Sequence, residues 1–497
     1  MNQAHDRTRR SFLRTVGGLA SLALAPASRS WSAESRVRDL IVFLPGITGS
    51  VLQKDKKDIW GITGQSIADA LATLGRNLNA LELMDDPNDV EDLGDGVVAT
   101  RLFPDVHLIP GLWKIDGYSG VRTALSQRLR LNGAANYIEF PYDWRRDNRV
   151  AARKLARLVP IWLAQWKEMS GISDAKVVFI GHSMGGLVAR YYLECLEGWR
   201  YARRLITFGT PYRGSLNALD YLSNGYRKTF AGFKVADLSA LMRSFTSVYQ
   251  LLPRYPCVDI GDGAMRRPGE VSGLPNIVPS KAAAALTFHR ELERAICSNA
   301  AAKEYVRYWV NPIVGIDQLT KQSAVIREGR LVALSNLKGE DQNGDGTVPK
   351  PSAIPLGCTV EEDKEFANSA TYVSGIHGSL QNLPQVVRQV SEQLLLPDMN
   401  AVRGPEEEPE GFSLDVEDAY LVGEPVKIGC NSRMGAVEAW LVVETASARQ
   451  RLLQRQIALR PNEPINTSVE HLIAGTYRAA LEAEGRRLIS DVFVIAR

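Results

Sequence analysis

Short apolar runs alternate with amphipathic stretches through the first part of the chain. Four of these runs are strand candidates, at 40–44, 176–180, 204–208 and 313–316. Because nearly every position in them is apolar, we expect strands that are buried on both faces, as in a parallel sheet. Helical stretches lie between some of the runs, such as 186–193. Strands that alternate with helices predict an α/β fold.

Residues 216 to about 310 interrupt this alternation. Apolar residues recur there at the spacing of one helical face, and Pro253 ends the predicted helix. The stripe consists of Leu238, Leu241, Met242, Phe245, Val248, Tyr249 and Leu252. We interpret the segment as a cap inserted over the sheet. A stripe of this kind is more typical of a cap's own core than of a lipid-binding surface.

The pattern changes again beyond a charged linker, rich in Pro and Gly, at 399–411. Short strand candidates bounded by turn residues follow, and they lie at 423–429, 437–443, 475–480 and 492–495. Such strands predict a β-sandwich of the immunoglobulin-like kind at 412–497. The α/β domain is then expected at 38–398.

The first 27 residues follow the order of an export signal. Arg9 and Arg10 lie in a twin-arginine motif, and a short apolar stretch comes next at 16–24. Ala25-Pro26-Ala27 then offers a cleavage site of small residues. We therefore expect residues 1–27 to be removed and the protein to be periplasmic or secreted.

Composition and charge narrow the functional classes. The 497 residues are 45% hydrophobic and 23% charged, which excludes wholesale disorder and disfavours an integral membrane protein. The formal net charge is +3, but residues 1–27 hold four Arg and one Asp, so the remainder carries 55 basic and 55 acidic residues. No basic block interleaved with aromatic residues occurs, so nucleic acid is not an expected partner. Transient contact with a membrane or lipid surface is compatible with this composition.

The cysteines are odd in number and far apart. There are five, at positions 195, 257, 297, 358 and 430, so at least one thiol is free. No C-x-x-C pair exists, which argues against zinc sites and thioredoxin-like chemistry.

A candidate nucleophile stands out in Gly181-His182-Ser183-Met184-Gly185, which fits G-x-S-x-G. A predicted strand at 176–180 leads into it and a predicted helix at 186–193 leads out. This strand–turn–helix context is that of a nucleophile elbow, in which small residues allow a tight turn that exposes the serine hydroxyl. Ser183 is therefore the expected nucleophile.

A serine nucleophile needs a base, and the chain has six histidines. His377 is the one that follows both the serine and the candidate acids within the sheet domain, as the expected order of serine, acid and histidine requires. The others lie in the signal, in the elbow, before the acids or in the sandwich: His5, His182, His107, His289 and His471. Elimination thus selects His377 as the base.

Two aspartates compete as the acid. Asp345 lies in the string 341–349, which also resembles the start of a calcium loop, but position twelve of that loop is Ser352 instead of Glu. Asp317 directly follows the strand at 313–316. Spacing favours Asp345 and leaves Asp317 open.

Negative charge on a carbonyl oxygen would need backbone donors near Ser183. The turn Pro45-Gly46-Ile47, after the first strand, can aim one N–H at it, and Met184 can supply another. On position alone, a simple Pro-Gly turn is an equal interpretation.

These motifs together resemble the lecithin:cholesterol acyltransferase-like family of α/β-hydrolases, which includes lysosomal phospholipase A2. The resemblance rests on five segments in family order, at 43–50, 140–145, 181–185, 209–215 and 344–349. It implies an α/β-hydrolase fold, with Ser183 as nucleophile, Asp345 as acid, His377 as base and Ile47 as an oxyanion donor.

The chain also departs from this family. Members that act on lipoprotein or lysosomal lipid carry a lid closed by cysteines after the first strand, whereas residues 45–110 contain no cysteine. Trp60 lies where a lid aromatic would sit, and a structural role is at least as well supported. This departure argues against a long-chain phospholipid substrate.

We accordingly expect an exported serine acyl hydrolase or O-acyltransferase that acts on lipid or other carboxylic esters through an acyl-enzyme. No metal or organic cofactor is needed for this chemistry. The alternatives are a peptidase or amidase on the same fold, and an inactive scaffold that displays the C-terminal sandwich as a binding module.

Overall fold

The computed structural model describes residues 37–60, 80–104, 107–109, 113–129, 131, 136–225, 227–230, 233–395, 411–433, 435–461 and 463–496. The predicted export signal at 1–27 lies outside these residues, as does the predicted linker at 399–411 apart from Gly411.

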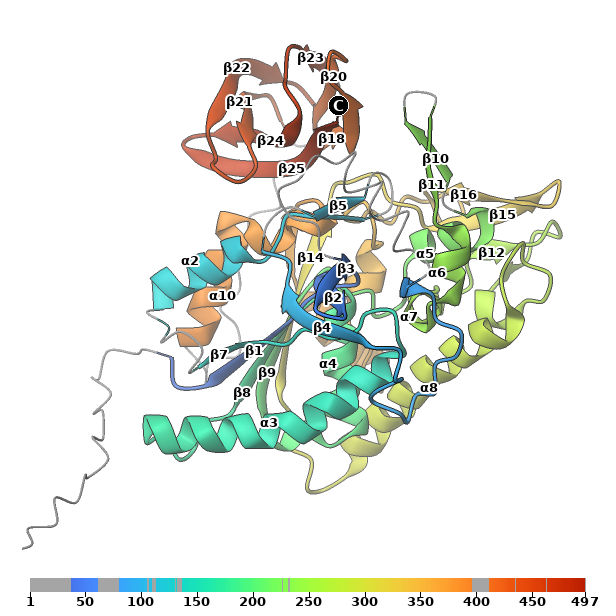
Figure 1. The fold of residues 1–497 in the computed structure, drawn as a ribbon, viewed down its shortest axis with the longest axis vertical. Coiled ribbons are helices and arrows are strands. Elements are labelled where there is room, and N and C mark those ends of the chain that lie inside the picture. The colour runs from blue at the N-terminus through green and yellow to red at the C-terminus, as the bar shows by residue number, and fades with distance from the viewer. Residues whose placement is uncertain are drawn as a thin grey trace, which may run out of the picture. The chain divides into compact units, whose positions relative to one another are not determined.

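A six-stranded parallel sheet forms the centre of the α/β part (Figure 1). In spatial order its strands are β17 (Thr371–Ser374), β14 (Trp309–Ile316), β9 (Ala202–Phe208), β8 (Val177–His182), β1 (Leu40–Leu44) and β7 (Tyr137–Glu139). The four strands predicted from apolar runs are all present and form the middle of the sheet. The two edge strands, β17 and β7, have only four and three residues, too few for a clear apolar run.

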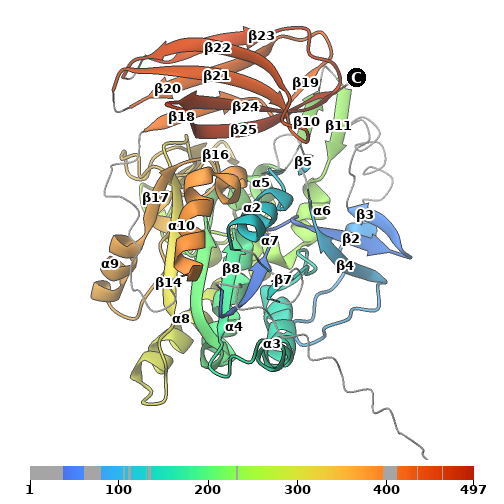
Figure 2. The same cartoon turned by 90° about the vertical axis from the view of Figure 1, so that its left-hand side faces the viewer.

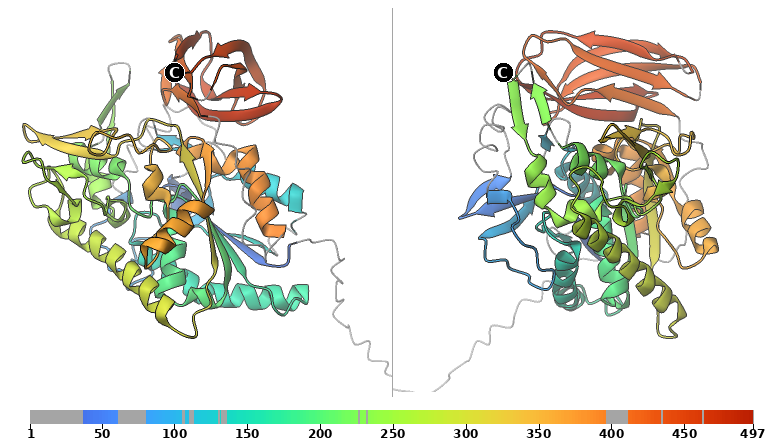
Figure 3. Two further views of the ribbon diagram at one scale, coloured as in Figure 1. Left: turned by 180° about the vertical axis from the view of Figure 1, so that it is seen from behind. Right: turned by 90° about the vertical axis from the view of Figure 1, so that its right-hand side faces the viewer.

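Helices cover both faces of this sheet (Figures 1 and 3). On one face, α2 (Ser119–Leu129) and α10 (Pro384–Leu395) share a hydrophobic core with Ile41 and Phe43 of β1. On the other, α4 (Met184–Cys195) contacts the sheet and packs between α3 (Asn148–Ser170) and α8 (Pro279–Ala301). Because β1 is buried on both faces, all five of its residues are apolar.

The segment predicted as a cap contains several short elements. It holds α5 (Leu216–Asn224), β10 (Arg227–Phe230), β11 (Phe233–Asp237), α6 (Ser239–Ser244), α7 (Thr246–Gln250), β12 (Val258–Asp259), β13 (Met265–Arg266), η3 (Pro268–Glu270) and α8. The prediction of one helix ending at Pro253 is wrong, because Phe245 adopts an extended conformation and separates α6 from α7. Every residue of the predicted apolar stripe is buried, as expected for core.

Smaller sheets and helices complete the α/β part. They are β2 (Ser50–Lys54), β3 (Lys57–Trp60), β4 (Val97–Leu102), β5 (His107–Ile109), β6 (Trp113–Ile115), η2 (Gly198–Arg200), β15 (Ser323–Arg327), β16 (Arg330–Leu334), η4 (Lys350–Ala353), α9 (Val360–Ser369) and η5 (His377–Asn382).

The C-terminal strands form two sheets that enclose their own apolar core, which confirms the predicted β-sandwich (Figure 2). One sheet has the order β18 (Phe412–Val416), β20 (Val426–Ser432), β23 (Ile465–Val469). The other has the order β19 (Ala419–Leu421), β25 (Arg486–Ala496), β24 (Gly475–Ala483), β21 (Val437–Thr445), β22 (Arg451–Leu459).

One disulfide joins Cys297 of α8 to Cys358, which lies just before α9. Cys195, Cys257 and Cys430 are free thiols, in keeping with the odd number of cysteines. Among the described residues, no helix is both long enough and apolar enough to cross a membrane.

Candidate active site

Ser183 stands on a strained turn between β8 and α4. Its φ of 52° and ψ of −125° are unusual for a residue with a side chain, and the surrounding packing imposes them. A Cβ added to Gly181 would lie 2.6 Å from the backbone of Gly186, and one added to Gly185 would lie 2.5 Å from the carbonyl oxygen of Pro45. These approaches explain why the turn requires glycine at both positions.

The elbow and the turn after β1 lie side by side because their strands pair in register. Leu44, the last residue of β1, pairs with Gly181, so the next residues of the two strands are neighbours. A Cβ on Gly46 would lie 2.9 Å from the Cβ of Ser183. Adjacent parallel strands end at the same edge of the sheet, so the turn Pro45-Gly46-Ile47 lies against the serine.

His377, the first residue of η5 after β17, lies between the serine and an aspartate. Its Nε2 is 2.9 Å from Ser183 Oγ, and its Nδ1 is 2.7 Å from Asp345 Oδ2. All three side chains are nearly buried, with 6% of Ser183, 8% of His377 and 1% of Asp345 exposed. The structure thus brings together the three side chains that the sequence singled out.

Backbone groups hold the Asp345 carboxylate in place. Its Oδ1 accepts hydrogen bonds from the backbone N–H groups of Thr347 and Val348, at 2.9 Å and 2.6 Å. The backbone N–H of His377 donates to the Asp345 carbonyl oxygen at 2.9 Å. A Cβ on Gly209 would lie 2.8 Å from Asp345 Oδ2 and 2.9 Å from His377 Nδ1, so the space beside this pair admits only glycine.

Asp317, the competing acid, binds other groups. It accepts a hydrogen bond from Ser374 Oγ at 2.6 Å and one from Asn343 Nδ2 at 3.2 Å. Its distance to Arg433 Nη1 is 3.7 Å. The structure therefore places Asp345, and not Asp317, against His377.

The calcium-loop interpretation of 341–349 is not supported by how its oxygens are used. Asp341 Oδ1 accepts from Gln322 Nε2 at 2.6 Å, and Asn343 Oδ1 accepts from the backbone N–H of Asp317 at 2.6 Å. Asp345 is committed to His377. Within the described ranges, no cluster of three or more His, Cys, Asp or Glu side chains is arranged to hold a metal ion.

Two residues near the site were not assigned a role from the sequence, namely Tyr118 and His182. The Tyr118 hydroxyl accepts a hydrogen bond from the backbone N–H of Gly46 at 2.9 Å, and it lies 2.9 Å from His182 Nδ1. His182 Nε2 lies 3.1 Å from the carbonyl oxygen of His377. Burial, helped by the nearby His377, lowers the pKa of His182 to about 3, so this imidazole is neutral.

This network limits which backbone donors can face a substrate oxygen. The N–H of Gly46 is taken by Tyr118, whereas Ile47, the next residue of the turn, lines the same cavity as Ser183. Met184 is the first residue of α4, where N–H groups have no partner within the helix. That Ile47 and Met184 are the oxyanion donors stays a prediction from the sequence.

Trp60, which the sequence placed at a lid position, is 3% exposed. Its Nε1 donates to the carbonyl oxygen of Thr48 at 3.1 Å, and its ring packs against Trp144 with centroids 4.8 Å apart. These contacts are those of a structural tryptophan.

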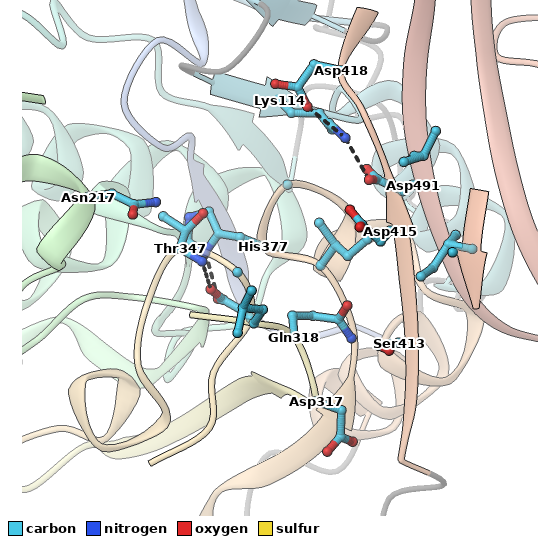
Figure 4. A pocket seen from close by; sticks show the side chains of 18 of the residues that line it. Lys114, Asn217, Asp317, Gln318, Thr347, His377, Ser413, Asp415, Asp418 and Asp491 are labelled. Carbon is cyan, nitrogen blue, oxygen red and sulfur yellow. Dashed lines mark hydrogen bonds and ion pairs between the residues drawn. The ribbon is translucent and has the colours of Figure 1, made fainter. Parts of the chain in front are cut away.

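A cavity of about 620 Å³ opens onto Ser183 and His377 (Figure 4). Residues of the α/β part line one side, among them Ile47 and Gln318, and residues of the C-terminal sandwich line the other, among them Asp415 and Asn431. The sequence did not indicate this second wall, because no local pattern reports which way a domain faces.

The parallel sheet with helices on both faces, and the strained serine turn at the carboxyl end of β8, define the α/β-hydrolase fold. Residues 114–353 match the model of the family described as lecithin:cholesterol acyltransferase, a segment that contains Ser183 and Asp345 and ends before His377. Over this segment the chain is similar to the lecithin:cholesterol acyltransferase family.

The curated relatives match over short segments. Lysosomal phospholipase A and acyltransferase of Bos taurus is 29% identical over 119 residues, or 23% of this chain and 28% of that protein. An uncharacterised protein of Saccharomyces cerevisiae is 28% identical over 186 residues, or 37% of this chain and 25% of that protein. The chain thus spans about a quarter of the length of these relatives.

Among solved structures, that of the Tle4–Tli4 complex covers 72% of this chain and 97% of the matched chain, with 13% identity and a TM-score of 0.46.

Proposed function

We propose that this protein is a serine esterase or O-acyltransferase that transfers the acyl group of a lipid or other carboxylic ester through an acyl-enzyme on Ser183. One observation carries the proposal: a single imidazole, that of His377, lies 2.9 Å from the Ser183 hydroxyl and 2.7 Å from the Asp345 carboxylate. This is the arrangement that activates a serine for attack on a carbonyl carbon. Lipid esters are the substrate class suggested by the relative named lysosomal phospholipase A and acyltransferase.

In the first half of the reaction, Ser183 Oγ attacks the ester carbonyl carbon while His377 Nε2 takes the hydroxyl proton. Asp345 stabilises the imidazolium and keeps the Nδ1 proton in place. The tetrahedral oxyanion accepts hydrogen bonds from the N–H groups of Ile47 and Met184. The intermediate then collapses, the bond to the alcohol oxygen breaks, and His377 returns the proton to that oxygen.

In the second half, water or another alcohol enters where the first alcohol left. His377 Nε2 takes its proton, the new oxygen attacks the acyl carbon, and the bond to Ser183 Oγ breaks with return of the proton to the serine. With water the product is a carboxylic acid, and with an alcohol it is a new ester.

The test is labelling by a fluorophosphonate together with hydrolysis of p-nitrophenyl butyrate. The wild type should be labelled at Ser183, and Ser183→Ala should lose the label and at least about 10³-fold in kcat. Ser369→Ala, at the end of α9, is the matched control and should behave as the wild type. A wild type that is neither labelled nor active would indicate an inactive scaffold, and faster cleavage of the matching p-nitroanilide would indicate an amidase.

We also propose that the protein is exported by the twin-arginine route to the periplasm or beyond. Arg9 and Arg10, the apolar stretch at 16–24 and the small residues at 25–27 support this destination. A structural disulfide between Cys297 and Cys358 suits an oxidising compartment.

A further inference from the structure

The C-terminal sandwich contacts the loop that carries His377 directly on one side of the histidine, and on the other side it reaches the loop through Lys114 of the α/β part. The side chain of Ile376 packs against the hydrophobic core of the sandwich. On the other side, a Cβ on Gly378 would lie 1.8 Å from the carbonyl oxygen of Lys114, so this glycine rests directly on Lys114. The sandwich therefore approaches the catalytic cavity from the side of His377.

Buried charges hold the sandwich in this position. Lys114 Nζ lies 2.6 Å from a carboxylate oxygen of Asp491 and 3.0 Å from one of Asp418, both in the sandwich (Figure 4). Two residues further along, Asp116 pairs with Arg478 of β24, and both side chains are almost fully buried. Since each part contributes a cation and at least one anion, the pairs favour one orientation of the sandwich over others.

The sandwich lies on the side of the active site at which the alcohol portion of the ester is expected to bind. In the proposed reaction His377 Nε2 gives its proton to the oxygen of the leaving alcohol, so that alcohol must lie within hydrogen-bond reach of the imidazole. The sandwich wall on the His377 side consequently faces the alcohol portion of the ester and, later, the incoming acceptor.

Strand alternation gives this wall a polar face. Along β18 and β20, apolar residues belong to the sandwich core, and Ser413, Asp415 and Asn431 alternate with them on the outer face. These three polar residues line the cavity, together with Leu414, Val416 and Cys430 of the same strands. Ser413 pairs with Asn431 across the two strands, and Asp415 lies two residues further along β18 on the same face. In an isolated sandwich this face would be turned to water, whereas here it is turned to the catalytic cavity.

The charged side chains that line the cavity are mostly acidic, so they disfavour a negatively charged ligand. Five acidic and two basic side chains line it: Asp317, Asp345, Asp415, Asp418 and Asp491, with Lys114 and Arg433. His377, Lys114 and Ser374 occupy four of the five carboxylates. Among the residues that the structure describes, the exposed side chain of Asp415 makes no hydrogen bond or ion pair. Oδ1 of Asn431 has no hydrogen-bond partner and is shielded from solvent. The Asp415 carboxylate therefore offers acceptor oxygens to whatever enters, and Asn431 Oδ1 is an unsatisfied acceptor on the same face of the sandwich.

We propose that Asp415 and Asn431 make the C-terminal sandwich the alcohol-binding wall of the active site, which selects esters whose alcohol donates hydrogen bonds and carries no negative charge. This inference rests on the proposed function. The shared chemistry of such alcohols is an N–H or O–H donor, supplied either by an ammonium group or by additional hydroxyls. A carboxylate focuses negative potential within the cavity and repels an anionic alcohol.

The experiment uses the full chain and esters that share one acyl group. Butyrylcholine carries an ammonium charge without a donor hydrogen, the butyrate ester of ethanolamine carries ammonium donors, glycerol monobutyrate carries hydroxyls, and the butyrate ester of glycolate is anionic. p-Nitrophenyl butyrate reports the acyl chemistry alone. In the wild type, kcat/KM for the ethanolamine or glycerol ester should exceed that for the glycolate ester by at least about 10-fold.

Asp415→Lys reverses the charge on this wall. The ratio of kcat/KM for the ethanolamine ester to that for the glycolate ester should fall by at least about 10-fold. Asn431→Ala should lower kcat/KM for glycerol monobutyrate by about 5-fold. Glu438→Lys, the same charge change on an exposed residue of β21 outside this cavity, is the control and should leave the ratios unchanged.

The outcomes separate this inference from the proposed function. Preference for the ethanolamine ester identifies ammonium recognition and preference for the glycerol ester identifies hydroxyl recognition, and either supports the proposal. If Asp415→Lys and Glu438→Lys have the same ester ratios while both hydrolyse p-nitrophenyl butyrate, the alcohol-binding role is wrong and the esterase stands. If the wild type hydrolyses none of the esters and is not labelled at Ser183, the proposed function itself fails.

Discussion

Tyr118 and His182 are joined through a 2.9 Å contact between the phenol oxygen and the imidazole Nδ1, deep beneath the serine turn. Because the Tyr118 oxygen accepts the N–H of Gly46, its own proton is free to donate to His182. His182 can then donate from Nε2 to the carbonyl oxygen of His377. One chain of hydrogen bonds thus connects the turn after β1, the serine elbow and the histidine loop.

Removing the Tyr118 hydroxyl should impair turnover more than binding. Tyr118→Phe leaves the N–H of Gly46 and Nδ1 of His182 without this partner, so the turn that carries Ile47 loses its anchor. We expect kcat for p-nitrophenyl butyrate to fall about 10-fold with KM nearly unchanged.

The control is Tyr255→Phe, which removes a hydroxyl that donates to the carbonyl oxygen of Gln322. A merely structural role for Tyr118 would lower the melting temperature of both variants and leave kcat alone. Equal kcat values in the two variants would contradict a positioning role.

The two aspartates near the acid position should respond differently to neutralisation. Asp345→Asn keeps the shape but loses the charge that stabilises the His377 imidazolium, and turnover should fall by about 10³-fold or more with KM little changed. Asp317→Asn should cost far less, because its partners are Ser374 and Asn343. Steady-state kinetics of both variants tests this prediction. If Asp317→Asn is the variant that loses turnover, the catalytic acid is Asp317, at the end of β14.

Buried neutral histidines should make the protein less stable in acid. Burial, with the charges of Arg254 and Arg149 adding to it, lowers the pKa of His289 to about 4. The unfolded chain takes up a proton on this histidine near pH 6.5, whereas the folded protein does so only near pH 4. The free energy of unfolding is therefore highest above about pH 6.5 and decreases as the pH falls toward 4. Between pH 7 and pH 5 this one group should cost about 2 kcal/mol of unfolding free energy.

His289→Gln tests this directly, because an amide can still donate to the carbonyl oxygen of Gln250 that His289 Nε2 contacts. Urea unfolding gives the free energy of unfolding at pH 7 and at pH 5. The decrease in this free energy from pH 7 to pH 5 should be about 2 kcal/mol smaller in the variant than in the wild type. The exposed His471 provides the control, and His471→Asn should leave the difference as it is. An unaltered difference in His289→Gln would show that this histidine takes up its proton in the native state too.

The disulfide should contribute measurably to stability. It closes a loop between residues 61 positions apart, Cys297 and Cys358, and so restricts the unfolded chain. The double variant Cys297→Ser/Cys358→Ser should lose about 2–4 kcal/mol. Thermal melting with and without reductant checks this, since reductant should lower the melting temperature of the wild type and not that of the variant.

Export can be tested at Arg9 and Arg10. Replacing both with Lys should leave unprocessed protein in the cytoplasm, because the export machinery reads the arginine pair. Fractionation and the mass of the mature protein provide the readout. Normal processing of the double-Lys variant would show that another route is used.

The parts of this protein that the sequence predicted are those with a local signal. The strand Leu40–Leu44 was located to the residue, because burial on both faces forces a continuous apolar run. Ser183 was identified from the residues next to it in the chain, since a tight turn between strand and helix demands small neighbours. The helix predicted before Pro253 was wrong in its continuity, because an extended Phe245 leaves the apolar spacing intact.

Where the answer depends on residues far apart in the chain, the tertiary structure decided it. Spacing and the family resemblance favoured Asp345 while spacing left Asp317 open, and the packing shows that the Asp345 carboxylate meets His377. Tyr118 belongs to no motif and lies 64 residues before His182, so nothing local reports their contact.

The C-terminal sandwich is the clearest example of the difference between what the sequence determined and what the tertiary structure decided. The sequence predicted a β-sandwich at 412–497, although β18 was not among the predicted strands. Apolar and polar residues alternate along β18, and because side chains of a strand point alternately to its two sides, the strand has a core face and an outer face. The sequence did not determine what the outer face meets. Lys114, Asp116 and their partners in the sandwich decide that, since ion pairs between distant segments set the orientation of the two parts and turn Asp415 toward the cavity that holds Ser183.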